Sequence, residues 1–108
     1  MKLAIPSLGR TLKSAMSYQL GRAPFIIIYD SDTKDYKTFE NTGFQLKDGS
    51  GLRAAEIILE NDADVLLIKE IGRKAYSFLM KEQVNVHMLK SGETVKSVIN
   101  RFMEKEGA

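Results

Sequence analysis

Four predicted loops of this chain carry the residue types that bind anions. The loops cover residues 7–23, 41–51, 69–72 and 90–93, and three of them lead into predicted helices. Backbone N–H groups at the start of a helix carry a partial positive charge and attract anions. Glycine lets a ligand approach the backbone closely, and an arginine guanidinium holds a carboxylate or phosphate through two parallel hydrogen bonds. We therefore predict an anion-binding site formed by these loops.

Eight residues make up the predicted site: Ser17, Gln19, Gly21, Arg22, Asn41, Gly51, Lys69 and Gly72. Arg22 is the best single candidate, because it stands directly between the long loop and a predicted strand. A structural interpretation competes with the functional one. Loop glycines and serines also form plain turns and caps, polar loop side chains also bond to nearby backbone, and Arg22 could pair with Asp30, Asp48 or Glu70.

Hydrophobic patterning predicts the elements that position these loops. Short runs of β-branched and aromatic residues are typical of strands, and apolar residues at helical spacing are typical of helices. The predicted strands cover residues 2–6, 24–30, 35–40, 64–68 and 85–89, and the predicted helices cover residues 51–62, 72–83 and 93–105. Seven apolar side chains are expected to be almost fully buried: Ile27, Leu66, Leu67, Phe78, Leu79, Val98 and Phe102.

The order of these elements predicts an α/β fold. The short connection between the second and third strands indicates a hairpin, and the strand–helix–strand units that follow indicate parallel pairs with right-handed crossovers. We expect one domain over residues 1–108, with a five-stranded mixed sheet and helices covering its faces. Loops that leave parallel strands meet at one edge of such a sheet, where ligands usually bind.

Composition excludes several classes of function. The chain has 108 residues, no cysteine, one histidine and a net charge of +2. Thiol catalysis and thiolate metal sites are thereby excluded, and the balanced charge does not favour a nucleic-acid partner. The longest apolar run is far shorter than the ~20 residues of a membrane span. We expect a cytoplasmic protein with neither a nucleic-acid nor a membrane partner.

Six short segments resemble those of the dinitrogenase iron–molybdenum cofactor biosynthesis family. Residues 17–25 resemble its S-x-H-F-G-R-A-P segment. With the other five segments, they occur in the family's order and extend over essentially the whole chain. These are Met1–Pro6, Glu40–Asn41, Gly49–Gly51 with Ala54–Ala55, Ile71–Gly72 with Ala75, and Ser91–Val95. The resemblance implies a nitrogenase accessory factor-like domain with a three-layer ribonuclease H-like motif, strand order 3-2-1-4-5 and strand 2 antiparallel.

The resemblance also implies a cargo. Family members tied to nitrogenase bind the iron–molybdenum cofactor or its cluster precursor, so we expect a binding domain for an anionic small molecule or such a precursor. This sequence has Gln19 where the family has a histidine and Leu20 where it has a phenylalanine. Metal–sulfur clusters are held by thiolate or imidazole, so no side chain is expected to ligate a metal, and the ligand stays unknown.

Two other functions compete with the binding domain. One is a protein-interaction or regulatory domain that has a protein partner and no small ligand. The other is an enzyme, which the sequence disfavours. Nucleases with a ribonuclease H-like core need a carboxylate on the first strand, and residues 2–6 have none. The single histidine, His87, lies inside a predicted strand, and no G-x-S-x-G motif is present, so we predict no catalytic residues.

Overall fold

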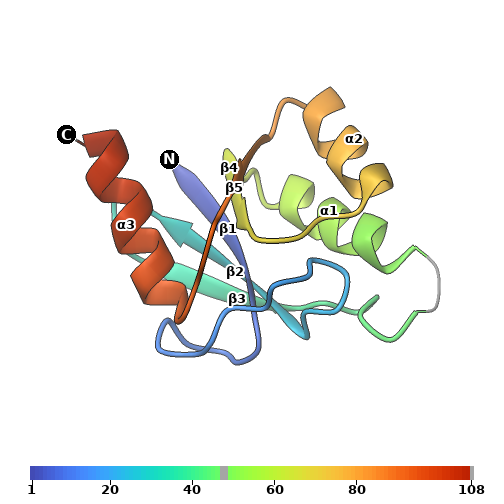
Figure 1. The fold of residues 1–108 in the computed structure, drawn as a ribbon, viewed down its shortest axis with the longest axis horizontal. Helices are drawn as coiled ribbons and strands as arrows, with labels where there is room; N and C mark the ends of the chain where they lie inside the picture. The colour runs from blue at the N-terminus through green and yellow to red at the C-terminus, as the bar shows by residue number, and fades with distance from the viewer. Residues whose placement is uncertain (47–48, 108) are drawn as a thin grey trace.

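The computed structural model describes residues 1–46 and 49–107 (Figure 1). Within them it contains the eight predicted elements in the predicted order. The strands are β1 (Lys2–Ser7), β2 (Phe25–Asp30), β3 (Tyr36–Glu40), β4 (Val65–Ile68) and β5 (Asn85–Met88). The helices are α1 (Ser50–Glu60), α2 (Arg73–Lys81) and α3 (Val95–Gly107).

Each helix boundary differs from the prediction by one or two residues, and two of the differences have a clear local reason. The second helix ends at Lys81 instead of residue 83, because Gln83 takes a left-handed backbone conformation with φ 66° that a helix cannot include. The third helix begins at Val95 instead of residue 93. Thr94 caps it there, since the Ser97 N–H donates to Thr94 Oγ1 at 3.1 Å and the Thr94 N–H donates to Ser97 Oγ at 3.1 Å. This reciprocal pair has the pattern of a capping box.

The strands form one mixed sheet in the order β3-β2-β1-β4-β5, as predicted. β2 runs antiparallel to both β1 and β3, whereas β1, β4 and β5 are parallel. Ile5 lies opposite Ile27 in the antiparallel pair, and Leu3 lies opposite Val65 in the parallel pair. Because β1, β4 and β5 share one direction, their carboxyl ends meet at one edge of the sheet.

Each face of the sheet buries its own core. Alternate residues of a strand point to opposite faces, so Ala4 and Leu66 pack under α1 and α2, whereas Leu3, Ile5 and Leu67 pack under α3. Figure 1 shows α3 on one side of the sheet and α1 with α2 on the other. The three-layer arrangement follows directly from this alternation.

The predicted core is confirmed except at Phe78. The other six side chains are at most 3 % exposed, but Phe78 is only partly buried and packs against the rim of the α1–α2 core. The helix α2 lies over the β5 end of the sheet, where only the narrow stripe of Ala75 and Leu79 is covered. Phe78 lies beside that stripe, about 100° around the helix from Leu79.

Residues 8–24 are held by three isolated backbone bridges although they contain no named strand or helix. Ser7 pairs with Met16, Ala15 pairs with Thr94, and Gln19 pairs with Glu70. The bridges tie this long loop to the end of β1, to the start of α3 and to the segment after β4. No helix within the described residues combines the length and apolar character needed to cross a membrane.

Candidate functional site

Two adjoining hollows lie at the edge of the sheet where β1, β4 and β5 end. The smaller one, the small hollow, has a volume of about 360 Å³, and the larger one, the groove, has a volume of about 890 Å³. The small hollow is lined by Gln19, Leu20, Gly21, Arg22, Ser50, Gly51, Glu70, Ile71 and Gly72. The groove is lined by Leu8, Ala15, Met16, Ser17, Tyr18, Gln19, Arg22, Glu70, Gly92, Glu93 and Thr94.

Two uncapped helix N-termini border the small hollow. The helix α1 starts after Gly49 and the helix α2 starts after Gly72, and neither has a side-chain cap hydrogen bond or an acidic residue in its first turn. This contrasts with α3, where the Val95 and Lys96 N–H groups donate to the Ser14 and Leu12 carbonyls of the long loop and the Ser97 N–H donates to Thr94 Oγ1. The first amides of a helix need partners, so the start of α1 and the start of α2 suit a bound anion.

Gly21 brings the long loop close to the start of α1. A Cβ atom on Gly21 would lie 2.8 Å from the backbone nitrogen of Gly51 and would also collide with Ser50 Oγ. No residue with a side chain fits there without a shift of the loop or of the helix. The wall of the small hollow thus depends on the absence of a side chain at residue 21.

Arg22 connects the small hollow to the loop before α1. Its Nη1 donates hydrogen bonds to the carbonyl oxygens of Phe44 at 3.3 Å and Leu46 at 3.0 Å. Among the described residues it makes no ion pair with Asp30 or Glu70, which were its alternative partners, whereas Asp48 lies outside the described residues. The side chain is exposed and lines both hollows, so its guanidinium is accessible to a ligand.

Glu70 places a carboxylate between the two hollows. Its backbone N–H donates to the Tyr18 carbonyl at 2.8 Å, and Gln19 Nε2 donates to Glu70 Oε2 at 3.2 Å. The Gln19–Glu70 pair lies at the boundary between the small hollow and the groove, because both residues line both spaces. The negative charge of Glu70 would oppose an anion placed in the small hollow.

Five of the eight predicted site residues line the small hollow: Gln19, Gly21, Arg22, Gly51 and Gly72. The other three lie elsewhere. Ser17 lines the groove and donates from Oγ to the Gln19 carbonyl at 3.1 Å. Asn41 is buried and donates from Nδ2 to the Ala23 carbonyl at 2.8 Å. This contact agrees with the structural interpretation, in which the side chain fixes the loop. The Nζ of Lys69 lies 4.3 Å from the ring centre of Tyr18 and lines neither space.

Sequence reasoning missed the residues that build the groove. Leu8, Met16 and Tyr18 belong to a loop without clear periodicity, so no pattern placed them together. The Tyr18 hydroxyl donates to the Gly92 carbonyl at 3.2 Å, which joins two segments far apart in the chain. Two signals were available: the family-like segments 17–25 and 91–95, which contain Tyr18 and Gly92.

Charge is unevenly distributed between the two ends of the sheet. Five aspartates lie at the end opposite the hollows, Asp30 as the last residue of β2 and the other four in connections: Asp32, Asp35, Asp62 and Asp64. At the edge with the hollows, the connections and helix starts carry Arg10, Lys13, Arg22, Lys69, Arg73, Lys74 and Lys90. Hydrogen bonds from the backbone N–H of Asp32, and secondarily of Thr33, lower the pKa of Asp30 below its usual value. These basic residues outnumber Glu40, Glu70 and Glu93 at the same edge, so the edge as a whole attracts anions, although Glu70 and Glu93 line the groove.

The fold defines a small α/β protein with two hollows at one edge of its sheet, and comparison with known proteins identifies its family. Residues 1–105 match the family described as "Dinitrogenase iron-molybdenum cofactor", so the chain belongs to that family. The apo form of the orange protein from Desulfovibrio gigas is similar, with 26 % identity, a TM-score of 0.90, and 97 % of this chain and 88 % of that chain covered. No protein with a curated description matches significantly.

A second solved structure shares the fold. It is a Thermotoga protein described as a candidate NifB protein of the DUF35 family, with 31 % identity and a TM-score of 0.83. The match covers 95 % of this chain and 87 % of that chain.

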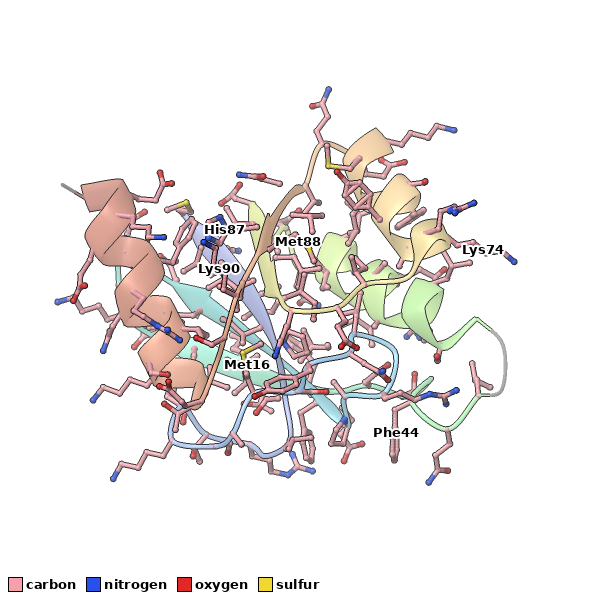
Figure 2. All side chains as sticks on the ribbon, viewed as in Figure 1. Met16, Phe44, Lys74, His87, Met88 and Lys90 are labelled. Carbon is pink, nitrogen blue, oxygen red and sulfur yellow. The ribbon has the colours of Figure 1, made fainter. Side chains whose placement is uncertain are left out.

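The donor atoms near the hollows do not suit direct ligation of a metal cluster. Within residues 1–46 and 49–107, no three His, Cys, Asp or Glu side chains are grouped so that they could hold a metal ion. His87 instead points toward α3 (Figure 2), where its ring packs edge-on against Phe102 with 5.0 Å between ring centres. The residues around the small hollow therefore offer hydrogen bonds and positive charge rather than metal ligands.

Proposed function

We propose that this chain is a non-enzymatic, cytoplasmic binding domain for an anionic small molecule or metal-cluster precursor, which occupies the small hollow. The observation that carries the proposal is the convergence of two uncapped helix N-termini with Arg22 on one space. Family membership supports a cargo related to the iron–molybdenum cofactor. Residues 1–108 would act as one accessory domain.

The proposed binding mode uses hydrogen bonds and charge. The amides of residues 50–51 and 73–74 and the Arg22 guanidinium would hold carboxylate, phosphate or sulfide-type anions, and charge-assisted hydrogen bonds of this kind are the stronger ones. A cluster precursor would arrive with its own ligands complete, since the hollow supplies no thiolate or imidazole. The chain would then release its cargo without breaking a metal–protein bond.

The test is a titration with citrate or homocitrate followed by amide resonances. We expect shifts at residues 17–22 and 49–53, with Arg22→Ala weakening binding by about 1.5–3 kcal/mol, the usual worth of a hydrogen bond to a charged group. Lys81→Ala is the matched control, because Lys81 is a basic residue at the other end of α2. If Arg22→Ala unfolds the protein and no anion shifts these resonances, the site is structural and the proposal fails.

A protein-interaction or regulatory domain is the second candidate function. Large apolar side chains are exposed around the hollows: Leu8, Tyr18, Phe44 and Leu46 are 36–55 % exposed. Figure 2 shows Phe44 projecting from the loop that precedes α1. Under this function, Phe44→Ser would abolish binding to a protein partner, and citrate would shift no amide resonance.

A further inference from the structure

The groove differs from the small hollow in its chemistry. Leu8, Met16 and Tyr18 supply a largely apolar wall, and their exposed fractions are 55 %, 3 % and 45 %. The volume of about 890 Å³ is well within the range of small-molecule sites. Apolar walls with a few placed polar groups are typical of such sites. The groove therefore suits an uncharged, apolar part of a ligand.

The walls of the groove are held in place by contacts between segments. Two contacts hold Tyr18 in place. Its hydroxyl donates a hydrogen bond to the Gly92 carbonyl at 3.2 Å, and Lys69 Nζ lies over the ring at 4.3 Å from its centre. The Met16 N–H donates to the Glu93 carbonyl at 2.9 Å. A Cβ on Gly92 would collide with Met16 Sδ, so the glycine makes room for the thioether at the base of the groove.

Charge determines how a ligand would lie across the two spaces. Glu70 and Glu93 put carboxylates along the groove, so an anionic group is disfavoured there. Arg22 and the uncapped helix starts lie on the side of the small hollow. Because Gln19, Arg22 and Glu70 line both spaces, one molecule can extend from one into the other.

We propose that the ligand is an organic anion with an apolar, ring-sized body. Its anionic group occupies the small hollow beside Arg22, and its body lies in the groove against Leu8, Met16 and Tyr18. This inference rests on the proposed function and adds the class of ligand to it.

The experiment compares three probes on the whole chain: inorganic phosphate, 2-naphthyl phosphate and 2-naphthol. We expect 2-naphthyl phosphate to bind at least tenfold more tightly than phosphate, and 2-naphthol to bind weakly. Phosphate should shift the amides of residues 19–22, 50–51 and 73–74 only, whereas 2-naphthyl phosphate should also shift Leu8, Met16 and Gly92.

Two variants separate the body of the ligand from its anionic group. Leu8→Asn should weaken 2-naphthyl phosphate at least threefold and leave phosphate unchanged, because Leu8 lines only the groove. Tyr18→Ser gives an independent second test of the same wall. Met80→Asn is the matched control, since Met80 is 48 % exposed on α2 and lines neither space.

Each outcome decides between the two proposals. Equal affinities for phosphate and 2-naphthyl phosphate would overturn the inference and leave the proposed function standing. Binding of 2-naphthol as tight as that of 2-naphthyl phosphate would also overturn the inference, because the groove would then act without the small hollow. Absence of binding by either phosphate probe would overturn the proposed function and the inference together.

Discussion

At the scale of single residues, the position of each polar group within its loop decides its role. Asn41 and Arg22 were both candidate ligand-binding residues in loops. Asn41, however, is 1 % exposed, and its side-chain amide forms hydrogen bonds with backbone groups. Among the described residues, Arg22 donates hydrogen bonds only from Nη1, to the carbonyls of the neighbouring loop. The side chain also lines the small hollow. A buried polar group has to be satisfied internally, whereas an exposed guanidinium can serve a ligand.

Glu70→Gln should strengthen anion binding. The substitution removes a negative charge from the small hollow and keeps an oxygen that accepts the Gln19 hydrogen bond. We expect a gain of about 0.5–1 kcal/mol, the scale of interactions between exposed charges. Calorimetric titration with citrate measures it. Glu93→Gln is the matched control, because Glu93 lines the groove alone. A weaker affinity in Glu70→Gln would show that the carboxylate helps to hold the ligand.

Anaerobic reconstitution should leave no tightly bound cluster on the isolated protein. The chain has no cysteine, Gln19 stands at the position of the family's loop histidine, and His87 packs against Phe102. Without thiolate or imidazole ligands, iron and molybdenum should be lost on desalting. Metal analysis of the desalted protein is the measurement. Near-stoichiometric iron would contradict this prediction and would point to ligation by other side chains.

At the scale of elements, the three helices differ in how the N–H groups of their first turn are satisfied. The first amides of α3 are satisfied within the protein, by the Ser14 and Leu12 carbonyls and by Thr94 Oγ1. The helices α1 and α2 leave theirs without a side-chain cap, and both begin at the small hollow. The long loop closes this space because Gly21 permits its approach to Ser50 and Gly51.

Gly21→Ala should disrupt the small hollow, whereas Gly72→Ala should be tolerated. A methyl group at residue 21 would lie 2.8 Å from the Gly51 nitrogen, but one at residue 72 would meet no atom within 4 Å. We expect Gly21→Ala to reduce citrate affinity at least tenfold and to lower the unfolding temperature, with Gly72→Ala unfolding at a temperature close to that of the wild type. Calorimetry and thermal unfolding of both variants are the measurements. Equal behaviour of the two would mean that the loop moves away without consequence.

Phe102→Ala should cost about 3–5 kcal/mol of unfolding free energy, as large-to-small changes in packed cores do. Phe102 is 3 % exposed and packs with Val98 and His87 between α3 and the sheet. Urea denaturation measures the change, and Tyr76→Ala, at a site 40 % exposed on α2, is the control. A loss below about 1 kcal/mol would mean that α3 is not firmly docked on the sheet.

At the scale of the whole molecule, the fold turns a nearly neutral chain into one with two differently charged ends. The net charge is only +2, but every strand and helix runs between the two ends of the sheet. Connections at one end collect aspartates, and connections at the other collect arginines and lysines. Fields of this kind concentrate ligands of the opposite charge near the site.

The double variant Lys13→Gln, Lys90→Gln should weaken citrate binding severalfold at low salt only. Both residues lie in connections at the basic edge and line neither space. Long-range attraction is screened within roughly 30 Å at 0.01 M salt and roughly 3 Å at 1 M salt. Titrations at both salt concentrations measure the effect, with Lys37→Gln on β3 as the control. An equal loss at high salt would indicate direct contact with the ligand.

The patterns in the amino-acid sequence determined the elements, their order and a mixed five-stranded sheet, whereas the strand order 3-2-1-4-5 came from the resemblance to the family. Runs such as Phe25–Asp30 and the helical spacing in Val95–Gly107 are local patterns, and short connections leave few ways to join them. The sequence also indicated which loops reach the ligand edge, and five of the eight predicted site residues line the small hollow. The predicted elements rest on local patterns. The predicted loops rest on the rule that parallel strands end at the same edge of a sheet.

Only the tertiary structure decided how the loops are arranged in space. The bridge between Gln19 and Glu70 and the hydrogen bond from Tyr18 to Gly92 join residues 51 and 74 positions apart, and no periodicity encodes such pairs. The groove arises from these long-range contacts, as does the burial of Asn41. Local sequence sets backbone preferences within a few residues, whereas the partner of a loop side chain depends on which distant segment packs beside it.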